Sequence, residues 1–331
     1  MSGVSDAQAA PSPVVAFGRL LRIARAPTAR SDVFVGIAIG HASQWPPDIL
    51  PWLLIPASLG VYHGAMALND WADRADDART RPERPIPSGA IPAGLALGTA
   101  ALLMLGGLFW AFAAGPRAGL WMGVVALLAV TYDVAGRGPW RGPLLLGLCR
   151  AGNLGAGLMS PWLVGATDEA PLGLLALAAA YGLHVVFIGR LGRLEDDEDE
   201  GALGRRPSAA LRGAALTTLA IPIAAAASLG FDRIAAGTDS APAAAGQLAS
   251  AAIAAWHATG LFRALAHGEQ DGWTRGGVGA ATGLCLRRLP LLPASIAASG
   301  VFLGPVATVA LVVALGGARV SAALRRLFPL T

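Results

Sequence analysis

Lysine is absent from this sequence, so all 25 basic residues are arginine. Charged residues make up only 14% of the 331 residues, whereas a soluble globular domain carries roughly a quarter. Cysteine is also scarce, and Cys149 and Cys285 form neither a metal-binding spacing nor a disulfide framework. These shortages argue against a soluble domain, a zinc-finger type of site and a disulfide-stapled fold. Because the arginines are split among short segments between apolar runs, they also argue against a nucleic-acid-binding stripe.

Hydrophobic residues account for 54% of the chain, and the mean hydropathy is +0.56. The apolar runs are long and do not alternate, which indicates helices and not strands. Proline-rich segments separate the runs, as helix stop signals do. The sequence therefore predicts an all-α polytopic membrane bundle of about nine transmembrane helices, each near the length that crosses a bilayer. The expected spans are 31–44, 49–68, 93–113, 117–134, 143–163, 171–190, 209–229, 245–266 and 293–316.

The two ends of the chain look different from the middle. Residues 1–13 are small and polar and lack the pattern of a cleaved signal, so we expect a disordered tail over 1–16. The membrane domain is expected over 17–318, followed by a C-terminal tail over 319–331.

Arginine placement predicts the topology. Nineteen of the 25 arginines lie in the N-terminal segment and in the loops after the even-numbered spans, while the opposite loops hold only Arg117 and Arg233. The positive-inside rule then places the N-terminus and those loops in the cytoplasm. The C-terminal Arg319, Arg325 and Arg326 fall on the wrong side. Either the tail breaks the bias or the last segment is not a simple span, and we favour the first.

An acidic run follows the second span. If it continues that helix, Asp70, Asp73 and Asp77 share one face at spacings of three and four residues. Like charges so close repel one another unless they share a cation, and Mg²⁺ prefers such oxygen ligands together with substrate phosphates. The alternative for one such run alone is a solvated loop.

A second acidic run, 195–200, follows the sixth span, so the two runs mark a weak internal repeat. Asp196, Asp199 and Glu200 can again share a helical face. Two such clusters at one membrane face can hold two metal ions bridged by a diphosphate. Arginine pairs bidentately with phosphate, although flanking arginines also anchor helices at the interface. The flanking arginines are Arg81, Arg84, Arg205 and Arg206.

The segment Asn69-Asp70-x-x-Asp73-x-x-x-Asp77, followed by Arg84-Pro85-Ile86-Pro87-Ser88-Gly89, resembles the first signature of the UbiA-type membrane prenyltransferases. The run from Asp196 to Glu200 before Gly204-Arg205-Arg206 resembles their second aspartate-rich motif, and Arg25-Ala26-Pro27-Thr28 is similar to the segment before their first helix.

This resemblance implies a helical bundle with a central cavity, Mg²⁺ as cofactor and a prenyl diphosphate as donor. In that reading Asp70, Asp73 and Asp77 hold one metal ion, and Asp196 and Glu200, with Asp199, hold the other. Asn69 orients the diphosphate, and an aromatic or lipid-like hydrophobic acceptor attacks the prenyl carbon. The sequence departs from the family pattern at Arg193 and Glu200 and after Tyr132-Asp133, which leaves the metal stoichiometry and the acceptor open.

Several polar residues fall inside predicted spans. Arg150 and Asn153 lie one turn apart in the fifth span, and an intramembrane arginine is a functional candidate by default. Arg150 either reaches the diphosphate or acceptor, or pairs with a carboxylate such as Asp133. Tyr132 is a candidate for substrate binding. Single histidines in spans, here His63 and His184, line a cavity or, more often, bridge helices.

Three functions are compatible with these features. The leading one is an Mg²⁺-dependent membrane prenyltransferase that uses both aspartate-rich loops at the cytoplasmic face. A transporter that keeps the fold without the reaction is the first alternative. An assembly factor for a membrane complex is the second, and it predicts no dependence on the carboxylates.

Overall fold

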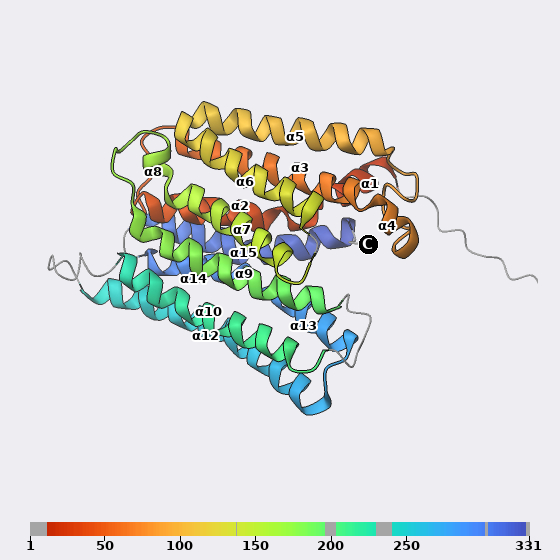
Figure 1. Cartoon of the computed structure of the whole chain (residues 1–331). Helices are drawn as coiled ribbons and strands as arrows, with labels where there is room; N and C mark the ends of the chain where they lie inside the picture. Colours follow the sequence, from red (N-terminus) through yellow and green to blue (C-terminus); the bar gives the residue numbers. More distant parts are fainter. Residues whose placement is uncertain (1–11, 137, 196–202, 230–239, 302–303, 329–331) are drawn as a thin grey trace, which may run out of the picture.

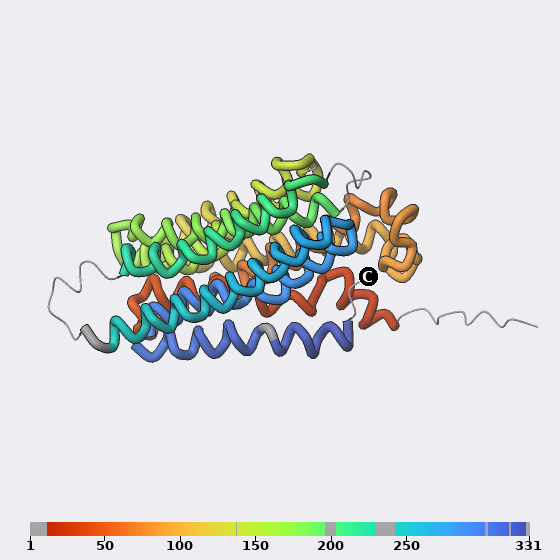
Figure 2. The backbone as a smooth tube through the Cα atoms, turned by 90° about the horizontal axis from the view of Figure 1, so that it is seen from below, coloured from red at the N-terminus to blue at the C-terminus, as the bar shows by residue number. Residues whose placement is uncertain are grey.

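A computed structural model describes residues 12–136, 138–195, 203–229, 240–301 and 304–328. Regular secondary structure over these ranges is helical throughout, which confirms the all-α prediction (Figure 1). The long helices lie side by side along one direction, and short helices and loops close the two ends of the bundle (Figure 2).

The helices differ in length and in their place in the bundle. The longer ones are α2 (Ala26–Gly40), α3 (Leu54–Ala72), α5 (Ala93–Ala114), α6 (Pro116–Ala135), α7 (Arg141–Leu158), α9 (Leu175–Glu195), α10 (Arg206–Leu229), α12 (Ser240–Asp271), α13 (Arg275–Arg288) and α15 (Pro305–Leu327). The shorter ones are α1 (Pro13–Leu20), α4 (Arg74–Thr80), α8 (Ser160–Leu163), α14 (Leu291–Ser299) and the 3-10 turns Ile23–Arg25, Leu50–Leu53 and Leu172–Leu174.

Five of these helices are long and apolar enough to cross a membrane: α5, α6, α9 with its preceding turn, α10 and α15. Their outer faces carry exposed large apolar side chains, such as Leu102, Leu127 and Ile223. A soluble protein rarely leaves so much apolar surface uncovered, whereas lipid solvates it. The chain is therefore a multi-pass membrane protein.

Helices α2 and α7 approach each other at a pair of glycines. A Cβ atom on Gly36 would lie 2.6 Å from the carbonyl oxygen of Leu154 and 2.8 Å from the Cα atom of Gly157. A side chain at either glycine would separate the two backbones, and small residues allow close packing of this kind in membranes. The contact holds the polar residues of α2 and α7 next to each other inside the bundle.

The predicted final span, 293–316, is wrong, because α14 ends at Ser299 and α15 begins at Pro305. The break packs on the loop after α2. The hydroxyl of Ser43 donates to the carbonyl oxygen of Gly300 (2.8 Å), and a Cβ on Gly304 would lie 2.4 Å from the carbonyl oxygen of Ser43. Pro305 then starts a new helix, a position that suits its missing N–H.

Helix α15 runs back along the bundle and ends beside α1 (Figure 1). The Phe328 ring fills the space where a Cβ on Gly18 would lie. Residues 319–327, expected as a tail, are the last part of α15, and residues 13–16 belong to α1. The C-terminal arginines therefore reach the end of the bundle that carries α1, and the interpretation that they break the arginine bias is wrong. The last segment consists of α14, a break and α15, and is not the single span 293–316 that was expected.

Candidate functional site

The first acidic run lies where α3 meets α4, at the end of the bundle that also carries α1 (Figure 1). Helix α3 ends at Ala72, Asp73 caps it, and α4 begins at Arg74, so the expected helix is interrupted within the motif. Asp70 and Asp77 are nevertheless both buried, at 5% and 4% exposure. The interruption turns them toward a shared partner.

That partner is Arg84, itself only 9% exposed. Its Nη1 atom lies 2.6 Å from Oδ2 of Asp77 and 3.6 Å from Oδ1 of Asp70. The buried guanidinium therefore joins the two ends of the motif. Proline residues follow directly, and Pro85 is buried beside it.

A second arginine, Arg22, reaches the same carboxylate from the segment after α1. Its Nη2 atom donates to Oδ1 of Asp70 (3.0 Å) and to Oδ1 of Asn69 (2.9 Å). The amide of Asn69 in turn donates to Oδ2 of Asp73 (3.3 Å). Sequence reasoning used Arg22 only as a topology signal. Its place three residues before the Arg25-Ala26-Pro27-Thr28 segment, which resembles a family motif, was the available clue. We call Arg22, Asn69, Asp70, Asp77 and Arg84 the acidic-arginine cluster.

Burial is the dominant influence on Asp70, which lies past the apolar part of α3. Burial raises the pKa of this carboxyl above its ordinary value, Arg22 and Arg84 oppose that rise, and Asp77 adds to it. A buried carboxyl in such surroundings gains from any further cation nearby.

The donor chemistry of this region fits Mg²⁺, because carboxylate oxygens are hard ligands. Among the residues that the structure describes, no three His, Cys, Asp or Glu side chains gather closely enough to hold a metal ion. Instead, Arg22 forms an ion pair with Asp70, and Arg84 forms one with Asp77. Asp196, Asp199 and Glu200, the predicted second cluster, lie outside the described residues.

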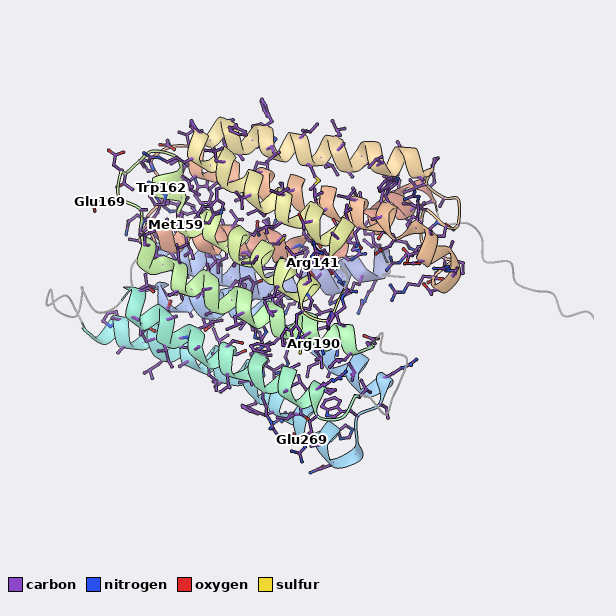
Figure 3. All side chains as sticks on the ribbon, viewed as in Figure 1. Arg141, Met159, Trp162, Glu169, Arg190 and Glu269 are labelled. Carbon is purple, nitrogen blue, oxygen red and sulfur yellow. The ribbon has the colours of Figure 1, made fainter. Side chains whose placement is uncertain are left out.

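The remaining predicted arginines are exposed. Arg81 caps α4, while Arg205 and Arg206 stand where α10 begins, at the same end of the bundle (Figure 1). Figure 3 shows Arg141 and Arg190 toward this end and Met159, Trp162 and Glu169 at the opposite one. Exposed arginines gathered at one end of the bundle can attract an anion.

A cavity of about 100 Å³ lies inside the bundle, next to the acidic-arginine cluster. Met66, one helical turn before Asp70, is part of its wall. Its volume is below the roughly 300–1,000 Å³ of pockets that enclose a drug-sized ligand, so a long chain would have to extend beyond it. The lining residues used below are Tyr62, Tyr132, Asp133, Cys149, Arg150 and Asn153.

The side chain of Arg150 pairs with residues of α2 and α9. Its Nη2 atom lies 3.1 Å from Oδ2 of Asp32 and donates to the hydroxyl of Tyr181 (2.7 Å), which itself donates to Oδ1 of Asp32 (3.1 Å). The partner is therefore Asp32 and not the expected Asp133. Sequence reasoning missed Asp32, although a lone carboxylate in a predicted span was a usable signal.

Asn153 is also satisfied within the protein. Its Oδ1 atom accepts from the hydroxyl of Ser58 (2.6 Å), and its amide donates to the carbonyl oxygen of Ala29 (3.1 Å). Both Arg150 and Asn153 line the cavity, and their side chains already pair with residues of neighbouring helices.

The two histidines bridge helices and are absent from the cavity wall. Nδ1 of His63 lies 2.8 Å from the carbonyl oxygen of Leu21, and Nδ1 of His184 lies 2.9 Å from that of Ala214. The helix-bridging interpretation is the one that these contacts favour.

Over the described residues, a helical membrane bundle with a buried acidic-arginine cluster beside an internal cavity defines a class: integral membrane proteins with a polar cluster at one end of the bundle. The sequence model described as the UbiA prenyltransferase family matches residues 33–274. The chain belongs to that family.

Similar proteins agree with this assignment. The chain is 32% identical over 183 residues to the bacteriochlorophyll synthase 33 kDa chain of Cereibacter sphaeroides, covering 50% of this chain and 56% of that one. It is 32% identical over 157 residues to the same-named chain of Rhodobacter capsulatus, covering 41% and 47%. The chain therefore matches about half the length of these curated relatives.

Solved structures show the same fold. A digeranylgeranylglyceryl phosphate synthase superposes with a TM-score of 0.58 at 14% identity, covering 86% of this chain and 98% of that one. A UbiA homolog from Aeropyrum pernix K1 gives a TM-score of 0.56 at 21% identity, covering 82% and 96%. A UbiA homolog from Archaeoglobus fulgidus, bound to Cd²⁺, gives 0.53 at 16% identity, covering 87% and 98%.

Proposed function

We propose that the protein transfers a prenyl group from an isoprenoid diphosphate to a hydrophobic acceptor, in an Mg²⁺-dependent reaction at the cytoplasmic membrane face. The observation that carries the proposal is the buried acidic-arginine cluster, which stands directly beside a cavity inside the bundle of a UbiA-family chain. Charged groups are needed where a diphosphate departs, and an apolar interior is needed where its prenyl chain lies.

The residues divide into two roles. Asp70, Asp73 and Asp77, together with Asp196, Asp199 and Glu200, are the proposed metal ligands. Mg²⁺ there would neutralise the diphosphate as its bond to the prenyl carbon weakens. The protein's own cations contribute as well, because guanidinium groups hold phosphate oxygens in fixed geometry. Asn69 is proposed to orient the diphosphate. The proposed diphosphate-binding arginines are Arg81, Arg84, Arg205 and Arg206.

The family leaves the acceptor open. The names of similar proteins include a bacteriochlorophyll synthase and a digeranylgeranylglyceryl phosphate synthase, which make different products. We propose a hydrophobic, aromatic or lipid-like acceptor that reaches the cavity wall at Tyr132, Arg150 and Asn153.

The reaction is tested with purified protein in detergent. Geranyl, farnesyl and geranylgeranyl diphosphates are supplied with Mg²⁺, and diphosphate release and donor binding are measured with and without EDTA. We expect Mg²⁺-dependent binding and release for at least one donor. A native protein that shows neither overturns the proposal. Uptake of a prenyl lipid into sealed vesicles without diphosphate release would instead establish the transporter alternative.

We further propose that both described ends of the chain and the aspartate-rich loops face the cytoplasm. The support is the arginine bias together with the contact between Phe328 and Gly18, which brings the end of α15 to the arginine-rich side. In a background without Cys149 and Cys285, Glu169→Cys should react with an impermeant maleimide in intact cells. Arg326→Cys should react only after permeabilisation, and the reverse pattern would refute this orientation.

A further inference from the structure

The outer face of α12 carries a tryptophan, a glycine and an arginine in register. Trp256, Gly260 and Arg263 follow one another at spacings of four and three residues, so they share one face of the helix. Arg288 reaches this face from the end of α13, which lies against α12 (Figure 1). Its Nη1 atom donates to the carbonyl oxygen of Trp256 (2.9 Å), and its guanidinium carbon lies 5.6 Å from the centre of the Trp256 ring. A Cβ atom on Gly260 would overlap that Nη1 atom, so the glycine makes room for the guanidinium.

The positive charge on this surface is not balanced by the protein. Within the described part of the chain, Arg263 and Arg288 form no ion pair, and the neighbouring Arg287, which is exposed, forms none either. Glu269, farther along α12, is already paired with Arg212. A backbone carbonyl accepts one of the five N–H groups of the Arg288 guanidinium and does not neutralise it. An anion from outside the chain would supply the missing charge.

The surroundings of these arginines are apolar and exposed. Trp256 is 57% exposed, Phe262 44% and Leu286 37%, and in a membrane protein lipid covers such side chains. The span expected on α12 ends at residue 266, six residues after Gly260, which corresponds to about 9 Å along a helix. Arginine side chains extend to the headgroup level over such distances, and exposed tryptophan rings favour that level. The lipid itself therefore brings an anion within reach.

We propose that Arg263 and Arg288 bind the phosphate of an anionic phospholipid, whose acyl chains lie along the apolar surface beside Trp256. Guanidinium groups hold phosphate oxygens bidentately, and the acyl chains account for the exposed apolar side chains that a soluble phosphate would leave uncovered. A second copy of this chain does not offer the charge, because the carboxylates within the expected spans, Asp32 and Asp133, are both buried. The lipid site is separate from the proposed prenyl transfer.

Quenching of tryptophan fluorescence tests the proposal on the full-length protein. The protein is reconstituted in phosphatidylcholine nanodiscs that contain a small fraction of brominated phosphatidylglycerol or brominated phosphatidylcholine. The Trp256 signal is the difference between the native protein and Trp256→Phe. We expect phosphatidylglycerol to be enriched beside Trp256 at least about tenfold over phosphatidylcholine, since one arginine near the membrane surface contributes about fivefold. Equal quenching by both lipids overturns the proposal, and quenching by neither would show that protein covers this face.

Substitutions of the two arginines test the site directly. Arg288→Met and Arg263→Gln should each lower the preference for phosphatidylglycerol about fivefold, and the double change should remove most of it. Arg263 is exposed, so its variant remains informative even if Arg288→Met fails to fold. The matched control is Arg212→Gln with Glu269→Gln, which removes an ion pair nearby without changing the net charge. If the control loses as much preference as Arg288→Met, the two arginines do not form a specific site.

Soluble competitors distinguish a lipid headgroup from a free phosphate. Inorganic phosphate and glycerol phosphate, each at millimolar concentration, should leave the enrichment of phosphatidylglycerol nearly unchanged, because neither contacts the apolar surface beside Trp256. Displacement of the lipid by either compound would assign the two arginines to a soluble phosphate and would refute the lipid assignment. Raising the salt concentration should weaken the preference without abolishing it, since the charges are screened while the acyl contacts persist.

Discussion

Replacing Asp70 by alanine should lower Mg²⁺-dependent diphosphate release by about a hundred- to a thousandfold, the range seen when one preorganised electrostatic group is removed from a site. Asp70 is the residue on which Arg22 and Arg84 converge, at 3.0 and 3.6 Å. The variant leaves Arg22 its contact with Asn69 and leaves Arg84 its contact with Asp77. The fold should therefore survive, and the melting temperature should change little beside the loss of turnover.

Asp76→Ala is the matched control, because it removes a carboxylate from the same acidic run. The Asp76 side chain is 40% exposed and pairs with Arg79, away from the acidic-arginine cluster. Exposed pairs of this kind contribute little, so activity should stay close to that of the native protein. If both variants lose activity equally, the run acts through its overall charge and the assignment of Asp70 fails.

Replacing Asp32 by leucine should lower the free energy of unfolding by about 3–5 kcal/mol, because it leaves the Arg150 charge buried without its partner. Asp32 is fully buried and Arg150 nearly so, and Tyr181 completes the group. Unfolding in mixed micelles of a mild detergent and dodecyl sulfate, followed by tryptophan fluorescence, measures the change.

The double change Asp32→Leu with Arg150→Met should recover most of that loss, since removing both charges of a buried pair is often nearly neutral. Asp48→Leu, at an exposed loop position, should have little effect. If the two single changes add in the double variant, the residues are not coupled, and Arg150 must owe its position to other contacts.

The sequence was sufficient for features that depend on local pattern. Long apolar runs indicated the helices. The expectation that Asp70, Asp73 and Asp77 share one face of a continuous helix was wrong, because α3 ends at Ala72 and α4 begins at Arg74.

The sequence was insufficient where the outcome depends on which helices become neighbours. The carboxylates of Asp32 and Asp133 both fall in predicted spans. The close approach of α2 and α7 at Gly36 places Asp32, and not Asp133, beside Arg150.

The prediction of the final span was wrong for a related reason. Hydropathy treats 293–316 as one apolar run, because glycine and alanine on either side of a break count as apolar. The break at Gly300 is fixed by a hydrogen bond to Ser43, a residue far away in the sequence. Arg22 could not be assigned to Asp70 for the same reason, since the two meet only after α1 folds against α3.

The contact between Phe328 and Gly18 affects where a tag can be attached to the protein. A fluorescent protein or an affinity tag fused shortly after Phe328 would begin beside Gly18 of α1, at the end of the bundle that carries the acidic-arginine cluster. Bulk attached there would crowd that end of the bundle, and a polyhistidine tag would bring metal-binding side chains close to the proposed metal site. The loop around Glu169, at the far end of the bundle, is the better place for a reporter (Figure 3).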